Sequence, residues 1–295
     1  MTSSVLTGKE FVSKYPNNTF YKLTKKNEIH NNFPFIDGLN IDPIAFNPTD
    51  CCSPGGIYFS DYDNIGRWIE YSNTQMYWIR KIQIPPDALV CVCKNKFKSD
   101  KIILEHRELL SEFEGWKNYD FCLQAVKLNK LSLKYINQIN YFGDIYNSSD
   151  LNKLYETAVS YDGMALEYIN AGLQTDEICE LAVRSKGFAL QFAWHEFINC
   201  NLCYLAIRRN PFALQFIEHY TDDMARLAVR LDGRVLEFLT HQNKDICFQA
   251  VCSNGMALEF VYDEFKDIMM CEIAVKLNNR ALKFVPKNLL DKLSL

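Results

Sequence analysis

The sequence predicts an α+β protein in two parts: a small N-terminal α+β domain and an α-solenoid of about seven short helix–turn–helix repeats. Three observations predict this. One motif recurs at fixed offsets through the C-terminal part, which is typical of repeat architectures. The first hundred residues instead alternate strand-like segments with Gly, Pro and Asn, and the change of pattern occurs just before Trp116. We therefore expect domains at residues 1–112 and 113–295.

The N-terminal domain is predicted from short segments rich in Tyr, Ile and Trp that turn-forming residues separate. We expect a short helix over residues 63–71, a turn at 85–88, and a helix at 105–115 that joins the domains. The expected strands are residues 20–23, 57–59, 77–84, 89–93 and 97–104.

The C-terminal part repeats an Ala-Val or Ala-Ile dipeptide, followed seven residues after its second member by Leu and two residues later by an aromatic residue. Successive copies lie 22–24 residues apart, except that residues 137–150 lengthen the first interval. The central dipeptides begin at Ala125, Ala158, Ala182, Ala206, Ala228, Ala250 and Ala274. The leucines are Leu133, Leu166, Leu190, Leu214, Leu236, Leu258 and Leu282.

The sixth copy shows how each repeat is expected to fold. Its first helix carries one apolar stripe formed by Ile246, Cys247, Ala250 and Val251. Gly255 is expected to end this helix in a left-handed conformation, before a second short helix. A hairpin of this size cannot bury its own apolar face, so the copies are predicted to stack around a continuous core.

Five of the eleven cysteines occupy one repeat position, four residues before the central Val or Ile: Cys122, Cys179, Cys203, Cys247 and Cys271. This pattern indicates a small apolar core position and a reducing compartment. Cys51, Cys52, Cys91 and Cys93 could meet His30 or His106 at a metal, but their spacing matches no zinc motif. We expect no metal, and strand alternation explains Cys91 and Cys93.

The last copy, AVKLNNRALKFVP (274–286), resembles the DUF4116 repeats, a family of unknown function. The segments FYKLTKKNEIHNNFPFIDGLN and CSPGGIYFSDYDNIGRWI resemble a module that precedes ankyrin or other repeats in proteins of giant viruses of the mimivirus group. Together the resemblances cover nearly the whole chain. They imply a fold and a viral origin, and neither family implies an activity.

A second resemblance, of FYKLT and GGIYFSDYDNIGRWIEYS to ADP-ribosyltransferases, offers an enzyme as the alternative, active or degenerate. It implies that Tyr71 would stack the nicotinamide, beside Tyr58 in the Gly-Ile-Tyr-Phe strand, and that Glu105 would orient the ribose. The chain departs from this pattern, since its first strand has Tyr21, Lys22 and Leu23 where a ribose-binding His or Arg is needed. A tight turn entering a buried strand also explains the Gly-Gly pair.

A basic residue follows the central Val or Ile in five of the seven copies, and we call these residues the basic stripe: Lys127, Arg184, Arg208, Arg230 and Lys276. The stripe could bind an acidic partner. Cations are also favoured in the last turn of a helix by the helix dipole, so a purely structural role is the simpler explanation.

Composition limits the functional classes. The net charge of −4 does not indicate nucleic-acid binding, and no long apolar run or charged leader predicts a membrane span or a signal peptide. No phosphate-binding, dinucleotide, zinc-protease or nucleophile-elbow motif is present. We expect a non-catalytic scaffold or adaptor without a cofactor, which binds protein partners in the host cytoplasm or in the virion.

Overall fold

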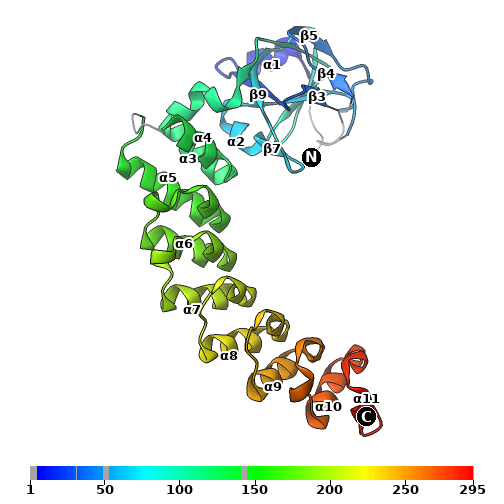
Figure 1. Ribbon diagram of the computed structural model, residues 1–295. Helices are drawn as coiled ribbons and strands as arrows, with labels where there is room; N and C mark the ends of the chain where they lie inside the picture. Colours follow the sequence, from blue (N-terminus) through cyan, green and yellow to red (C-terminus); the bar gives the residue numbers. More distant parts are fainter. Residues whose placement is uncertain (1–4, 31, 49–52, 141–144, 295) are drawn as a thin grey trace. The chain divides into compact units, whose positions relative to one another are not determined.

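The computed structural model describes residues 5–30, 32–48, 53–140 and 145–294. It divides into two compact units, Met1–Thr157 and Ala158–Leu295, each of which is described by itself. A β-sheet region precedes a region of many short helices, so the predicted mixed architecture is correct in outline (Figure 1). The predicted boundary at residue 112 marks where the repeat motif begins, and it stays a prediction.

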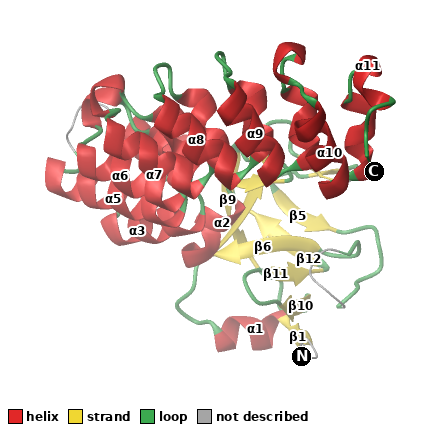
Figure 2. Ribbon diagram, turned by 90° about the horizontal axis from the view of Figure 1, so that it is seen from below, coloured by secondary structure: helices red, strands yellow, loops and turns green. Residues whose placement is uncertain are grey.

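In the described residues of the first unit, nine strands form one antiparallel sheet in the order β1-β10-β11-β6-β2-β9-β12-β5, with β13 paired to β9. Figure 2 shows several strands of this sheet as yellow arrows. Two small hairpins, β3–β4 and β7–β8, lie outside this sheet. The sheet strands are β1 Val5–Thr7, β2 Phe20–Thr24, β5 Gly38–Ile41, β6 Ile57–Asp61, β9 Trp78–Gln83, β10 Leu89–Val92, β11 Phe97–Ser99, β12 Lys101–Leu104 and β13 Glu108–Leu109. The hairpin strands are β3 Ile29–His30, β4 Phe33–Pro34, β7 Glu70–Tyr71 and β8 Thr74–Gln75.

An aromatic cluster forms the core of this sheet. Helix α1 (Gly8–Lys14), which sequence inspection missed, begins with a capping box between Thr7 and Glu10 and buries Phe11 completely. The ring of Phe11 packs 4.9 Å from that of Phe20 and 5.2 Å from that of Phe97, measured between centroids. Interleaved rings of this kind stabilise the core beyond their area alone.

The helix predicted over residues 105–115 is wrong. Glu108 and Leu109 instead pair with β9 as strand β13, and two 3₁₀-helices follow, η2 (Leu110–Glu112) and η3 (Glu114–Lys117). Pairing with a distant strand, together with burial of Leu110 and Trp116, outweighs the local helix propensity of this segment.

Two further elements are shorter than predicted. The helix expected at 63–71 is η1 (Tyr62–Asn64) and α2 (Ile65–Trp68), and its end forms the β7–β8 hairpin, with Ser72 and Asn73 at positive φ. The strand expected at 97–104 is interrupted at Asp100, whose carboxylate accepts a hydrogen bond from the Leu89 N–H at 2.8 Å.

The repeat motifs begin in the first unit with α3 (Tyr119–Leu128) and α4 (Ser132–Ile139), and α5 (Ser148–Tyr161) crosses the division between the units. In the second unit each α-helix from α6 to α10 is followed by a 3₁₀-helix, and these α-helices pack side by side in chain order (Figure 1). The α-helices are α6 Asp176–Ser185, α7 Cys200–Arg209, α8 Asp222–Leu231, α9 Lys244–Ser253, α10 Ile268–Leu277 and the terminal α11 Lys287–Leu290. The 3₁₀-helices of the motif are η4 Gly163–Tyr168, η6 Gly187–Phe192, η8 Pro211–Phe216, η9 Gly233–Phe238, η10 Gly255–Phe260 and η12 Asn279–Phe284. Short 3₁₀ turns connect some pairs: η5 Ala171–Leu173, η7 His195–Phe197 and η11 Asp263–Phe265.

The role predicted for the repeat glycines is wrong. Gly255 does not adopt a positive φ, and the extended residue Asn254 (φ −151°) makes the turn. A Cβ on Gly255 would lie 2.4 Å from the carbonyl oxygen of Ala274 in the next copy, and one on Gly233 would lie 2.0 Å from that of Ala250. Glycine therefore permits close packing between neighbouring copies.

The predicted core positions are confirmed except for the motif leucine of the last copy. The motif leucine is at most 1% exposed in the first six copies, and Leu282 in the last copy is 42% exposed. The five cysteines of the repeat position are all buried, as are Tyr155 and Ala225 at the same position in the other copies. Burial raises the pKa of the thiol of Cys179 and of Cys247 to about 11, so these cysteines are neutral core residues.

Candidate functional site

A cavity of about 690 Å³ opens in the first unit. Its walls come from β2, the β3–β4 hairpin, residues 53–56, β6, α2 and the β7 strand. Ligand cavities in proteins commonly have volumes of about 300–1,000 Å³. This cavity is the candidate small-molecule site of the chain.

The cavity lies where two adjacent strands separate. Strands β2 and β6 pair at Phe20–Asp61 and at Tyr21–Ser60, and the register ends there. Beyond this point the ammonium of Lys22 spans the opening and donates a hydrogen bond to the carbonyl oxygen of Tyr58 at 2.8 Å. Side chains of both strands therefore line the cavity.

Positive charge dominates the walls of the cavity. Burial and the charge of Lys96 lower the pKa of Lys22 to about 8, and burial, with Lys22 and Lys25, also lowers the pKa of His30. Among the described residues that line the cavity, Asp42 carries the one carboxylate, which accepts hydrogen bonds from the N–H groups of Ile44 (2.9 Å) and Gly56 (2.6 Å). The cavity thus disfavours further positive charge and favours an anion.

A second buried lysine holds one wall of the cavity. Lys98 in β11 is 1% exposed and donates hydrogen bonds to the carbonyl oxygens of Asn47 (2.8 Å) and Ser53 (3.0 Å). Gly55 and Gly56 both have positive φ, and a Cβ on Gly56 would lie 2.7 Å from the alkyl chain of Lys98. These contacts explain the Gly-Gly pair that precedes β6.

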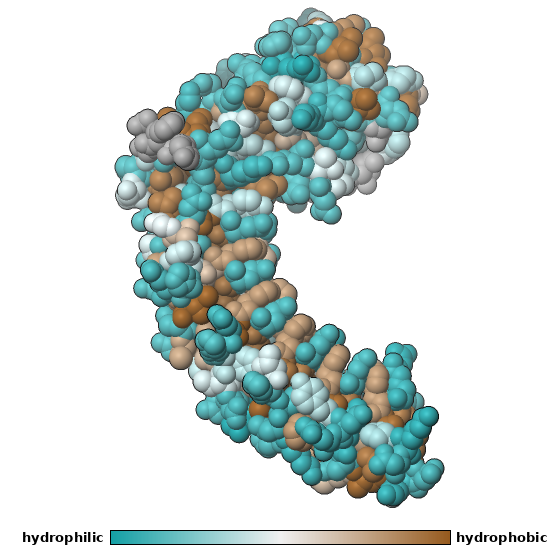
Figure 3. Space-filling model, in the orientation of Figure 1, coloured by the Kyte–Doolittle hydropathy of each residue, from teal (hydrophilic) through white to brown (hydrophobic). Residues whose placement is uncertain are grey.

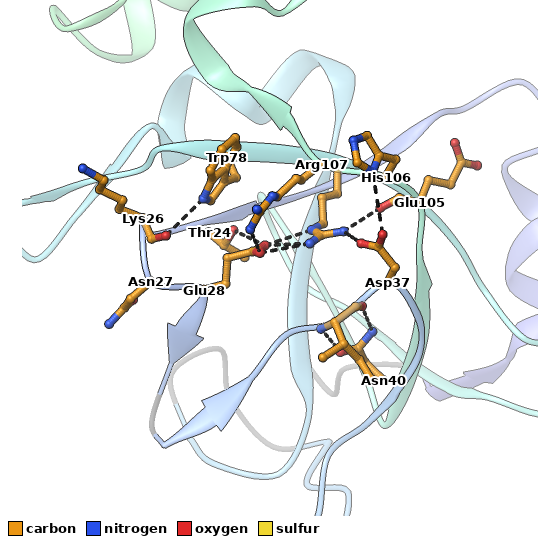
Figure 4. Close-up of polar contacts among 12 residues, drawn as sticks. Thr24, Lys26, Asn27, Glu28, Asp37, Asn40, Trp78, Glu105, His106 and Arg107 are labelled. Atoms are coloured by element: carbon orange, nitrogen blue, oxygen red, sulfur yellow. Dashed lines mark hydrogen bonds and ion pairs between the residues drawn. The ribbon is translucent and has the colours of Figure 1, made fainter.

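A buried ion-pair network attaches the β3–β4 hairpin to the sheet (Figure 4). The guanidinium of Arg80 in β9 donates to both carboxylate oxygens of Glu28, at 2.9 Å and 3.0 Å, and also pairs with Asp37. Arg107 donates to the same Glu28 carboxylate at 2.8 Å. Because a paired buried charge is costly to separate, the network holds the hairpin in place beside the cavity.

The structure brings together two of the three residues implied by the transferase resemblance. Tyr58 and Tyr71 both line the cavity. Glu105 does not line it, and its carboxylate accepts a hydrogen bond from the side chain of Gln83 at 3.2 Å instead. An acid that orients a ribose would have to reach the ligand, so this arrangement gives the enzyme alternative no support.

Sequence inspection missed the residues that give the cavity its chemistry, above all Lys22, Lys25, Lys96 and Trp68. One sequence signal could have found the buried lysines. Alternation along β2 places Lys22 on the same face as the buried Phe20, and Lys98 of β11 lies in a strand whose residues are all buried. A lysine at an inward strand position indicates a buried cation that needs an acceptor.

The basic stripe lies at helix ends, as the helix-dipole explanation expects. Arg184, Arg208, Arg230 and Lys276 are exposed in the last turns of α6, α7, α8 and α10. Lys127 is partly buried in the last turn of α3, in the first unit. Arg184 pairs with Glu180 one turn earlier in its helix. In the face shown by Figure 3, apolar and hydrophilic residues alternate along the second unit.

The other candidates considered for metal or membrane binding can be placed in part. Cys51 and Cys52 lie outside the described residues. Cys91 is buried in β10 and its thiol donates to the carbonyl oxygen of Pro48 at 3.3 Å, in agreement with the strand explanation. Cys93 lies just after the end of β10, so the strand explanation is wrong for this residue. Among the residues that the structure describes, no cluster of three His, Cys, Asp or Glu side chains suits a metal ion, and no helix has the length and apolar character to cross a bilayer.

Comparison with known proteins identifies similar chains. Residues 243–290 match the model of a domain of unknown function, DUF4116. Over 103 residues, 33% of this chain, the sequence is 34% identical to a protein of Acanthamoeba polyphaga mimivirus described as an ankyrin repeat protein, covering 30% of that protein. A second mimivirus ankyrin repeat protein is 25% identical over 114 residues, which is 36% of this chain and 55% of the relative.

An uncharacterized mimivirus protein is 29% identical over 117 residues, 38% of this chain and 82% of that protein. The matches to the two ankyrin repeat proteins above span less than two thirds of those relatives. No solved structure matches the chain. The predicted resemblance to giant-virus repeat proteins with DUF4116-like repeats is confirmed.

Proposed function

We propose that this chain is a non-catalytic protein-interaction adaptor, in which residues 113–295 form an α-solenoid of hairpin repeats behind an α+β module of residues 1–112. The observation that carries the proposal is the shared packing of the copies. The same positions are buried from one copy to the next, and each glycine contact joins a copy to its successor. Stacked repeats of this kind provide preorganised surfaces, which lower the entropic cost of binding a partner.

The relatives support the same role. Two of them are described as ankyrin repeat proteins. We infer protein partners for this chain by analogy, and a place of action in the host cytoplasm or in the virion. The cysteines that the structure describes are unpaired, and those at the repeat position are buried, which is consistent with a reducing compartment. We propose neither nucleic acid nor a membrane as a partner, and no cofactor.

The basic stripe is the part of the surface that we propose for an acidic partner. Arg208 and Arg230 extend from neighbouring helices, which pack against each other. Neither residue has an ion-pair partner among the described residues, whereas Arg184 is paired with Glu180. Exposed charges at an interface chiefly raise the association rate and weaken with added salt.

The test is affinity purification from infected cells with the full-length chain as bait. We expect the double variant Arg208→Glu/Arg230→Glu to retain the melting temperature of the wild type. The enrichment of its partner should fall about tenfold. A matched charge reversal of exposed lysines away from the repeats, Lys9→Glu/Lys26→Glu, should retain the partner. Equal loss by both variants would remove the stripe from the proposal, and absence of any enriched protein would contradict the adaptor function.

A further inference from the structure

We infer that the cavity of the first unit binds a small phosphorylated molecule with an aromatic ring, the chemical class of the nucleoside phosphates. This inference is independent of the adaptor function, because it concerns a different unit of the chain. Three features of the cavity carry it: its charge, its unsatisfied polar groups and its aromatic walls.

The charge of the cavity selects an anion. Lys22, Lys25 and Lys96 line it together with His30, and Asp42 opposes them while already accepting two backbone hydrogen bonds. Three ammonium groups around one cavity suit a phosphate dianion better than a single carboxylate. A bound phosphate would offset the mutual repulsion of these cations.

Two buried polar groups in the cavity have unused hydrogen-bonding capacity. Lys22 is 8% exposed, and among the described residues its ammonium has one hydrogen-bond acceptor, the Tyr58 carbonyl, although it can donate three bonds. Ser60 is 2% exposed, and its hydroxyl has no partner in the part of the chain that the structure describes. Buried polar groups are normally satisfied, so both groups indicate a missing acceptor.

The aromatic walls select a planar ring. Trp68 and Tyr71 lie 6.5 Å apart between centroids, and Tyr71 is 41% exposed, which leaves its ring accessible for stacking. The ammonium of Lys96 lies 4.3 Å from the ring centroid of Tyr58 and 4.8 Å from that of Trp68. The cationic and aromatic groups are therefore adjacent, as a ligand with both a ring and a phosphate requires. The aromatic lining residues are Tyr21, Phe33, Phe35, Tyr58, Phe59, Trp68 and Tyr71.

The walls are also held in place before any ligand arrives. Glu28 and Arg80 attach the β3–β4 hairpin, and Lys98 holds the carbonyl groups that precede β6. A rigid site loses little conformational entropy on binding. The volume of about 690 Å³ accommodates a ligand of mononucleotide size.

The experiment is calorimetric titration of the full-length chain with adenosine monophosphate, adenosine and inorganic phosphate. We expect adenosine monophosphate to bind about tenfold more tightly than either fragment, because it uses both halves of the cavity. At pH 8, titration in buffers of different ionisation enthalpy should show proton uptake, since the phosphate restores the charged form of Lys22.

Matched variants locate the site. Lys25→Gln and Tyr71→Leu should each weaken the binding of adenosine monophosphate about fivefold or more. The first substitution removes a cation that would contact the phosphate, and the second removes a ring that would stack on the base. The control variants are Lys26→Gln and Tyr77→Leu. Because Lys26 and Tyr77 do not line the cavity, both variants should bind adenosine monophosphate as the wild type does. Tyr77 is 40% exposed, so it matches Tyr71 in accessibility.

Three outcomes would overturn the inference. The first is no heat of binding with adenosine monophosphate at millimolar concentration, and the second is equally tight binding of adenosine. The third is an equal loss of affinity in the cavity variants and in the control variants. Each outcome leaves the partner enrichment of the repeat region untouched, so failure here and failure of the adaptor function can be told apart.

Discussion

The two units of this chain bury polar side chains to different extents. Among the described residues, Lys22, Glu28, Arg80 and Lys98 are buried charged residues of the first unit, whereas the second unit buries one polar side chain, Gln174. The ion pair of Arg80 with Glu28 joins residues 52 positions apart, and the hydrogen bond of Lys98 to Asn47 joins residues 51 apart. The first unit is therefore specified by contacts between distant segments.

The second unit satisfies the polar groups at its helix ends locally. Thr175, Asn199, Thr221, Asn243 and Asp267 each cap the helix that they precede by accepting a hydrogen bond from an N–H three residues later. After the helix, Asn254 accepts from the N–H two residues later, and Asp162 does the same in its copy. The comparison teaches that a repeated local rule can build one unit, while the other needs a long-range polar network.

The substitution with the largest expected effect breaks the buried ion-pair network of the first unit. Glu28→Gln should destabilise the first unit by about 3–5 kcal/mol, because the Arg80 guanidinium would remain buried without its main counter-ion. Urea unfolding followed by tryptophan fluorescence measures it, since Trp68, Trp78 and Trp116 report on the first unit and Trp194 on the second.

The matched control for Glu28→Gln is the exposed pair of Asp87 with Lys101, whose nitrogen and oxygen lie 2.6 Å apart. Asp87→Asn should cost far less than Glu28→Gln, because solvent screens an exposed ion pair. Similar losses for the two variants would mean that burial adds nothing to the Glu28 pair, and the contrast between the units would fail.

A large-to-small change tests the core of the second unit. Leu236→Ala should cost about 2–5 kcal/mol, because this side chain is fully buried. Leu282→Ala, at the same position of the last copy, should cost less than half as much, since Leu282 is 42% exposed. Denaturation followed by helical circular dichroism measures both, and equal costs would show that burial along the copies is not as described.

The close packing of neighbouring copies is tested by Gly233→Ala. The added methyl would lie 2.0 Å from the Ala250 carbonyl oxygen, so we expect a loss of about 1–3 kcal/mol. Gly172→Ala is the control, because a Cβ there meets nothing within 4 Å and its φ is not positive. Thermal unfolding of the two variants should differ clearly, and a neutral Gly233→Ala would restore the turn explanation for these glycines.

The smallest expected effect depends on pH. The hydrogen bonds from Lys244 and from the Met270 N–H lower the pKa of Asp267, which links α9 to the start of α10. A lowered folded-state pKa stabilises the fold above the unfolded value of about 3.9, and this contribution is lost as the pH falls below it.

Asp267→Asn retains the cap and removes the charge, so we expect a cost of less than about 1 kcal/mol at pH 7. Melting temperatures measured from pH 7 to pH 3 should converge for the variant and the wild type. If the difference between the two melting temperatures widened toward low pH, the stabilising role assigned to the Asp267 charge would be wrong.

Sequence inspection was most successful where the determinants of structure are local. The helical spacing of Ile246, Cys247, Ala250 and Val251 predicted the buried face of α9, which the structure confirms. The cysteine position was predicted as core because several copies could be compared within one chain. Inspection failed at residues 105–115, where the partner strand β9 lies about 30 residues earlier, and at the glycines, whose constraint comes from the next copy.

The sequence by itself therefore determined the repeat unit: its length, its buried positions and its kinship with giant-virus repeat proteins. These follow from a periodicity that each copy expresses within about two dozen residues. Only the tertiary structure decided where the sheet strands pair, why the glycines are required, and which residues surround the cavity. The reason is physical, because Lys22, Lys96 and Tyr71 acquire their shared chemistry only once segments far apart in the chain have been brought together.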